Sequence, residues 1–174
     1  MTVPDLILRP EIPADHPAVA ALLRAAFLDH PHGRPGEPVE PALLDALRQQ
    51  GGLTLALTAE AAGQVVGYIA FSPVRINGEP GAWYGMGPVG VLPEWQGQGI
   101  GSSLVDEGLR QLRAQGAQGC VLVGEPDYYR RFGFATDPLL TLPGVPPEYF
   151  LVCPLTDTYP VGELSFHAAF SLFV

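Results

Sequence analysis

The chain has 174 residues, of which 47% are apolar, and this is enough for one folded domain with a substantial core. Its 18 acidic and 9 basic residues give a net charge of −9, which repels nucleic acid and anionic membranes and favours a cationic small partner. All the basic residues are arginines, which excludes the lysine chemistries of phosphate-loop NTPases, pyridoxal-phosphate enzymes and Ser-x-x-Lys enzymes.

The two cysteines lie in apolar runs. Neither Cys120 nor Cys153 has Cys-x-x-Cys or histidine spacing, which predicts inert core thiols and no metal site. The N-terminus lacks a basic segment followed by an apolar stretch, and no run approaches the roughly 18 residues of a membrane span. We expect a cytoplasmic protein with no membrane partner, and a homodimer stays open.

The first half of the chain predicts a strand, two helices and a hairpin. A short strand covers about 6–9, and Asp15 is placed to cap a helix over 16–28. Alternating apolar residues at 53–57 and 65–71 predict an antiparallel hairpin. The second helix carries Leu43, Leu44 and Leu47.

A weakened strand followed by a helix is expected in the middle of the chain. Residues 83–91 form the strand, in which Gly87 and the donor-less Pro88 favour a bulge. A helix begins near Gly99 and packs on the sheet through apolar positions at four-residue spacing. These positions are Ile100, Leu104, Gly108 and Leu112.

The remaining elements complete a mixed α/β domain over 1–174, with a mostly antiparallel sheet of about six to seven strands flanked by helices. Asp106 and Arg110 are expected to pair on the solvent side of the preceding helix. Strand 83–91, that helix and the next strand form a parallel crossover. The later elements are strand 120–123, helix 126–132, strand 149–154 and strand 164–173.

The glycine-rich segment between strand 83–91 and its helix is a candidate pyrophosphate cradle. Gly97, Gly99 and Gly101 free the backbone, and a helix start leaves N–H groups without partners. The Rossmann fingerprint fails, because Ser102 stands where its third glycine is required. Taken alone, the spacing is also compatible with a tight turn that binds no ligand.

Two motifs resemble the GNAT superfamily of acetyl-CoA-dependent N-acetyltransferases. The first is Gln96-x-x-Gly99-x-Gly101 after the run Val89-Gly90-Val91-Leu92-Pro93, and the second is Tyr128-Tyr129-Arg130-Arg131-Phe132-Gly133-Phe134. The resemblance covers most of the chain, and the segment 162–167 is similar to the YhbS-like branch of these enzymes.

The resemblance implies acetyl-CoA as cosubstrate, with no metal. Loop amides would hold the pyrophosphate, and the end of strand 83–91 would pair with the pantetheine arm, which requires the neighbouring strand to splay away. Tyr129 would act as the catalytic acid that protonates the departing thiolate. The implied cofactor-binding residues are Val89, Gly90, Val91, Gln96, Gly97, Gln98, Gly99, Ile100 and Gly101.

The general base is not identified. Strand 83–91 contains no acid, and the asparagine that the family often has before the short helix is replaced by the run 124–127. Either arginine after Tyr129 is a candidate for the cofactor phosphates. Four of the open candidates for the base also have a simpler interpretation: Glu94 as a solvated turn residue, Glu125 and Asp127 as helix caps, and His167 as a core residue. The other two candidates, His30 and His32, lie in segment 30–38, which is rich in Pro and Gly and is a candidate lid.

The leading hypothesis is transfer of acetyl from acetyl-CoA to a primary amine of a small molecule or peptide by direct attack. The alternative is an acyl-CoA-binding sensor module of the same fold with little transfer activity, suggested by the missing strand acid. A nucleotide-dependent oxidoreductase is disfavoured by Ser102.

Overall fold

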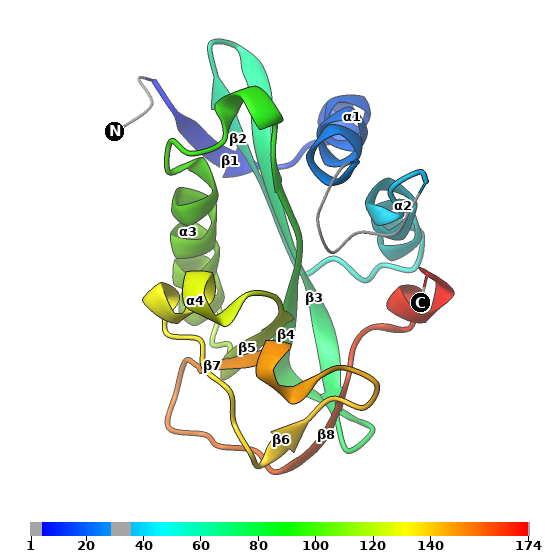
Figure 1. Cartoon of the computed structure of the whole chain (residues 1–174), viewed down its shortest axis with the longest axis vertical. Helices are drawn as coiled ribbons and strands as arrows, with labels where there is room; N and C mark the ends of the chain where they lie inside the picture. The colour runs from blue at the N-terminus through cyan, green and yellow to red at the C-terminus, as the bar shows by residue number, and fades with distance from the viewer. Residues whose placement is uncertain (1–4, 29–35, 174) are drawn as a thin grey trace.

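The computed structural model describes residues 5–28 and 36–173, whose strands lie between two groups of helices (Figure 1). The α-helices are α1 (His16–Phe27), α2 (Glu40–Gln49), α3 (Ile100–Ala114) and α4 (Pro126–Tyr129). The strands are β1 (Ile7–Pro10), β2 (Leu55–Ala61), β3 (Gln64–Ile76), β4 (Glu79–Val91), β5 (Gly119–Val123), β6 (Leu140–Thr141), β7 (Phe150–Pro154) and β8 (Gly162–Ser165). The 3₁₀ turns are η1 (Pro13–Asp15), η2 (Pro93–Trp95), η3 (Arg130–Phe132), η4 (Pro147–Tyr149) and η5 (Ala168–Phe173).

The strands follow the order β1-β2-β3-β4-β5-β7, with β8 beside β3 and the short β6 beside β8. The predicted hairpin is β2 and β3, and the predicted parallel pair is β4 and β5. The mixed, mostly antiparallel fold is therefore confirmed. Two details differ from expectation within the described residues: the sheet has eight strands, and β6 and β8 make a second parallel pair.

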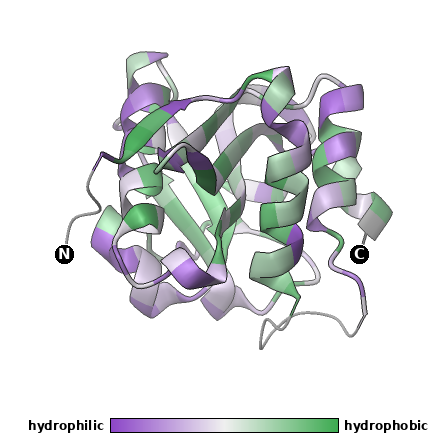
Figure 2. Ribbon diagram, turned by 90° about the horizontal axis from the view of Figure 1, so that it is seen from above, coloured by the Kyte–Doolittle hydropathy of each residue, from purple (hydrophilic) through white to green (hydrophobic). Residues whose placement is uncertain are grey.

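Each face of the central sheet is covered by its own helices. Tyr68 on β3 packs beneath α1 and α2, whereas Phe71 points to the opposite face, beneath α3. Figure 2 shows the strongly hydrophobic central strands enclosed between these helices. The approach of α3 is close: a Cβ atom added at Gly108 would lie 2.5 Å from the Phe71 ring, so α3 needs a glycine there.

Three local predictions are wrong. Asp15 does not cap α1; its carboxylate accepts two hydrogen bonds from the Arg9 guanidinium, at 2.8 and 2.9 Å, and one from the Ile12 N–H. Arg110 pairs with Glu107 rather than Asp106, because i,i+3 neighbours also share a helix face. The predicted strand 164–173 ends early, since β8 stops at Ser165 and η5 follows.

The predicted bulge lies in β4 and marks where β4 leaves β5. Phe71 pairs with Met86 and Ile69 pairs with Val89, so a single β3 residue between them faces both Gly87 and Pro88. Parallel pairing with β5 ends just before this bulge, at Gly85 opposite Val121. Among the residues that the structure describes, the last residues of β4 pair only with β3, so their other edge carries no strand on the side where β5 diverges.

Candidate active site

The segment from the end of β4 to α3 is a turn held by its own side chains and glycines. Gln96 donates its side-chain N–H to the Val91 carbonyl at 3.0 Å, which closes the loop onto β4. Gly97 and Gly99 have φ values of +77° and +84°, a backbone conformation that side-chain-bearing residues rarely adopt. Gly99 is the residue immediately before α3, so glycine sets the direction in which the helix begins.

The six N–H groups from Gly97 to Ser102 donate no hydrogen bond to the described parts of the chain. The next N–H, of Ser103, is the first to bond, to the Gly99 carbonyl at 3.0 Å. These donors lie at the positive end of the dipole of a 15-residue helix. A run of free donors at such an end is suited to bind a phosphate-like anion. The candidate residues Gly97, Gln98, Gly99, Ile100 and Gly101 all fall within this run.

Val89, Gly90 and Val91 form the open edge next to that loop. The two valines are half-buried and pack toward the α3 side, whereas Gly90 faces α1, where an added Cβ would lie 3.1 Å from Leu23. On β5, which has diverged from β4 at this point, the last residue, Val123, is 48% exposed. The main chain of β4 is thus free on one edge to pair with an extended, amide-bearing ligand.

Tyr128 and Tyr129 lie side by side on α4 with their ring planes nearly perpendicular, at 88° and 4.8 Å between centroids. The Tyr129 ring packs against Gly124, directly after β5, where an added Cβ would lie 2.7 Å from it. It also makes an edge contact with Phe134. The turn that follows ends at Gly133, with φ +96°, as the sequence predicts.

The Tyr129 hydroxyl has the properties of a proton donor. It has no hydrogen-bond partner among the described residues, which leaves it available for a ligand. Burial raises the pKa of Tyr129 to about 12, and the neighbouring Tyr128 contributes in the same direction. At neutral pH the phenol therefore keeps its proton.

The candidate bases do not gather at one point. Glu94 is exposed in η2, and His167 lies against Gly52 with its Nδ1 accepting the Ala169 N–H at 3.1 Å. The simpler capping interpretation of the acids at α4 is wrong: Glu125 makes no side-chain cap, and Asp127 pairs with Arg130. His30 and His32 lie outside the described residues, as does most of the candidate lid.

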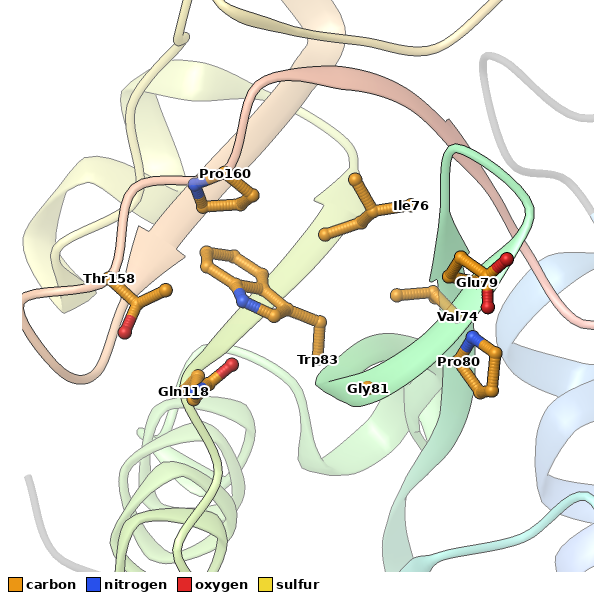
Figure 3. Close-up of a pocket in the computed structure, with 9 residues that line it drawn as sticks. All are labelled: Val74, Ile76, Glu79, Pro80, Gly81, Trp83, Gln118, Thr158 and Pro160. Carbon is orange, nitrogen blue, oxygen red and sulfur yellow. The ribbon is translucent and has the colours of Figure 1, made fainter.

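A hollow of about 210 Å³ at the other end of β4 has different properties (Figure 3). The ring of Trp83 lines it, and Glu79 is the one ionisable residue among the described residues that line it. It lies beside the part of β4 that pairs with β5, away from the point where the two strands diverge. Within the described residues there is also no cluster of side chains suited to hold a metal ion, and no helix is long and apolar enough to cross a membrane.

The model of the Acetyltransferase (GNAT) family matches residues 18–134. The chain belongs to this family. A GNAT family acetyltransferase from Brucella melitensis, solved in complex with acetyl-CoA, is 44% identical with a TM-score of 0.84, over 95% of this chain and 97% of that one. The YhbS structure from Escherichia coli, in complex with CoA, has a TM-score of 0.87 and 38% identity, over 97% and 93% of the two chains.

The uncharacterized N-acetyltransferase YhbS of E. coli K12 is 43% identical over 130 residues, which are 74% of this chain and 73% of the relative. The predicted resemblance to GNAT enzymes and to their YhbS-like branch is thereby confirmed. Sequence reasoning missed one feature of this GNAT site: the Tyr128 hydroxyl lies 3.4 Å from Ser102 on α3. The adjacent tyrosines were the available signal, but which of them faces α3 depends on how α4 docks.

Proposed function

We propose that this GNAT protein is one N-acetyltransferase domain over 1–174 that transfers acetyl from acetyl-CoA to a primary amine of a small molecule or peptide. The observation that carries the donor assignment is the run of six free N–H groups from Gly97 to Ser102. The donor assignment is also supported by two relatives whose structures were solved with acetyl-CoA and with CoA, at 44% and 38% identity to this chain.

The proposed donor site has two parts. The N–H groups of the run that begins at Gly97 hold the pyrophosphate, and Gln96 shapes the loop by its bond to Val91. The open edge of Val89, Gly90 and Val91 pairs with the amides of the pantetheine arm. This arrangement directs the thioester toward the point where β4 and β5 diverge.

The reaction proceeds by direct attack of the amine on the thioester carbonyl. The nitrogen forms a bond to the acetyl carbon, the C–S bond breaks, and Tyr129 gives its proton to the departing thiolate. Main-chain N–H groups of the bulged strand stabilise the oxyanion. Both cysteines are buried, and burial raises the pKa of each thiol, so neither is suited to form an acyl-enzyme.

β4 offers no carboxylate to deprotonate the amine where β4 and β5 diverge, because its acidic residue, Glu79, lies at the far end of the strand. We infer that the amine reacts from its neutral form and passes its proton to water. We also propose a cytoplasmic location. The net charge of −9 favours the amine, rather than nucleic acid or a membrane, as the partner.

The test is thiol release from acetyl-CoA across a panel of polyamines, aminoglycosides and peptide N-termini. We expect release with at least one amine, and about 100-fold slower turnover in Tyr129→Phe with unchanged acetyl-CoA affinity. Tight acetyl-CoA binding without release for any amine would favour the sensor module. Turnover of Tyr129→Phe equal to that of the wild type would remove Tyr129 from the mechanism.

A further inference from the structure

The hydroxyl of Tyr128 lies at the first turn of α3, beside the free N–H groups. It is 3.4 Å from the Ser102 Oγ, and a Cβ atom added at Gly101 would also lie 3.4 Å from it. The N–H groups of Gly101 and Ser102 are the last two in the unbonded run. Tyr128 thus brings a hydroxyl from α4 to the donors of α3.

The contact with Ser102 does not explain why the hydroxyl is there. Hydroxyl pairs usually bond at about 2.7–2.8 Å, so a 3.4 Å separation leaves most of the hydrogen-bonding capacity of both groups unused. The Tyr128 ring is held by other contacts, with Tyr129 at 4.8 Å and Phe132 at 5.6 Å between centroids. The ring would stay in place without its oxygen.

A cation lies on the same ring. The Arg131 guanidinium is 4.6 Å from the centroid of Tyr128, and its Nε donates to the Tyr128 carbonyl at 2.9 Å. Arg131 has no acidic partner among the described residues, whereas the adjacent Arg130 is paired with Asp127. Arg131 therefore keeps donors free for a ligand.

We propose that Tyr128 and Arg131 complete the phosphate site: Tyr128 donates its hydroxyl to the pyrophosphate held by the α3 N–H groups, and Arg131 adds the positive charge. The inference rests on the proposed function, because it assumes that this loop binds the pyrophosphate of CoA. It assigns different tasks to the adjacent tyrosines. Tyr128 positions the cofactor, while Tyr129 acts at the thiolate.

The first test compares Tyr128→Phe with Tyr129→Phe by calorimetric titration with CoA. Tyr128→Phe keeps the ring contacts and removes one hydrogen bond to an anion, so we expect the Kd for CoA to rise about tenfold. The KM for acetyl-CoA should rise similarly while kcat changes less than twofold. Tyr129→Phe should give the opposite pattern, with an unchanged Kd and a lower kcat.

The second test compares Arg131→Gln with Arg130→Gln at two salt concentrations. We expect Arg131→Gln to weaken CoA binding about fivefold at low salt and less at high salt, because screening reduces the contribution of an exposed charge. Arg130→Gln is the matched control and should stay within twofold of the wild type, since Arg130 is already paired with Asp127.

Three results would overturn the inference. The first is a Kd of Tyr128→Phe within twofold of a wild-type protein that itself binds CoA, and the second is equal losses in the two arginine variants. The third is a drop in the melting temperature of unliganded Tyr128→Phe together with a lower kcat, which would show a structural role instead. Failure of the proposed function looks different, because the wild-type protein itself would then not bind CoA.

Discussion

Replacing Gly99 by Ala tests the loop before α3, with Gly116→Ala as a matched control at the other end of the same helix. The two glycines have φ values of +84° and +86°, and an added Cβ meets nothing within 4 Å at either position. A left-handed conformation costs alanine about 1–2 kcal/mol. Each variant should therefore lower the melting temperature by about 2–8 °C for a chain of this length.

The variants should differ in cofactor binding. Gly99→Ala either keeps its strained backbone, with a methyl group in the space beside the free donors, or relaxes and turns at least one N–H away. Losing one hydrogen bond to a charged group costs about 1.5–3 kcal/mol, which is at least a tenfold rise in Kd. The assays are differential scanning fluorimetry and calorimetric titration with acetyl-CoA. Equal melting temperatures together with equal affinities for the two variants would refute the assignment of this loop.

Three further predictions concern packing, an ion pair and pH. Gly108→Ala should destabilise the protein by about 1–3 kcal/mol in urea titrations despite its better helix propensity, because its Cβ would lie 2.5 Å from the Phe71 ring, and Phe71→Leu should restore part of the loss. The hydrogen bonds from Arg9, more than the Ile12 N–H, lower the pKa of Asp15, so this pair stabilises the fold above the ordinary aspartate pKa and the contribution is lost as pH falls through the lowered value. Asp15→Asn should therefore reduce stability at pH 7 and flatten its decline in acid, and an unchanged acid unfolding curve would contradict this reasoning. Between pH 6 and 10 the rate should rise with the neutral fraction of the amine and show no fall from Tyr129, whose pKa is about 12; a profile whose midpoint ignores the acceptor's own pKa would indicate an enzyme base.

The regular elements were predictable because their patterns are local. Four-residue spacing from Ile100 gave α3, and alternation gave the β2–β3 hairpin. The bulge was predictable for the same reason, since Gly87 and Pro88 disrupt pairing by their own backbone chemistry. The glycine spacing of the loop also anticipated a helix start with unbonded N–H groups.

The remaining features depend on contacts between distant parts of the chain. Asp15 stays at the N-cap position of α1, but its carboxylate binds Arg9 instead of a helix N–H, because Arg9, held on β1, is a bidentate partner that is stronger than a cap. The apolar residues of η5 read as a strand, but Ala169 is buried against α2 rather than paired in the sheet. Whether Tyr128 or Tyr129 faces α3 likewise depends on the docking of α4, and no local pattern encodes it.

The bulge in β4 also acts as a parity switch for the sheet. Gly85 and Gly90 are five residues apart, an odd number that would place them on opposite faces of a regular strand, yet both face the α1 side, against Phe166 and Leu23. If β4 ran through Gly87 and Pro88 as a regular strand, without the bulge, Val89 and Val91 would turn toward α1, where even a Cβ atom added at Gly90 would lie 3.1 Å from Leu23. The bulge absorbs one residue and so keeps both valines on the α3 side. Deletion of Pro88 would leave these faces unchanged, whereas insertion of one residue after the bulge would reverse them.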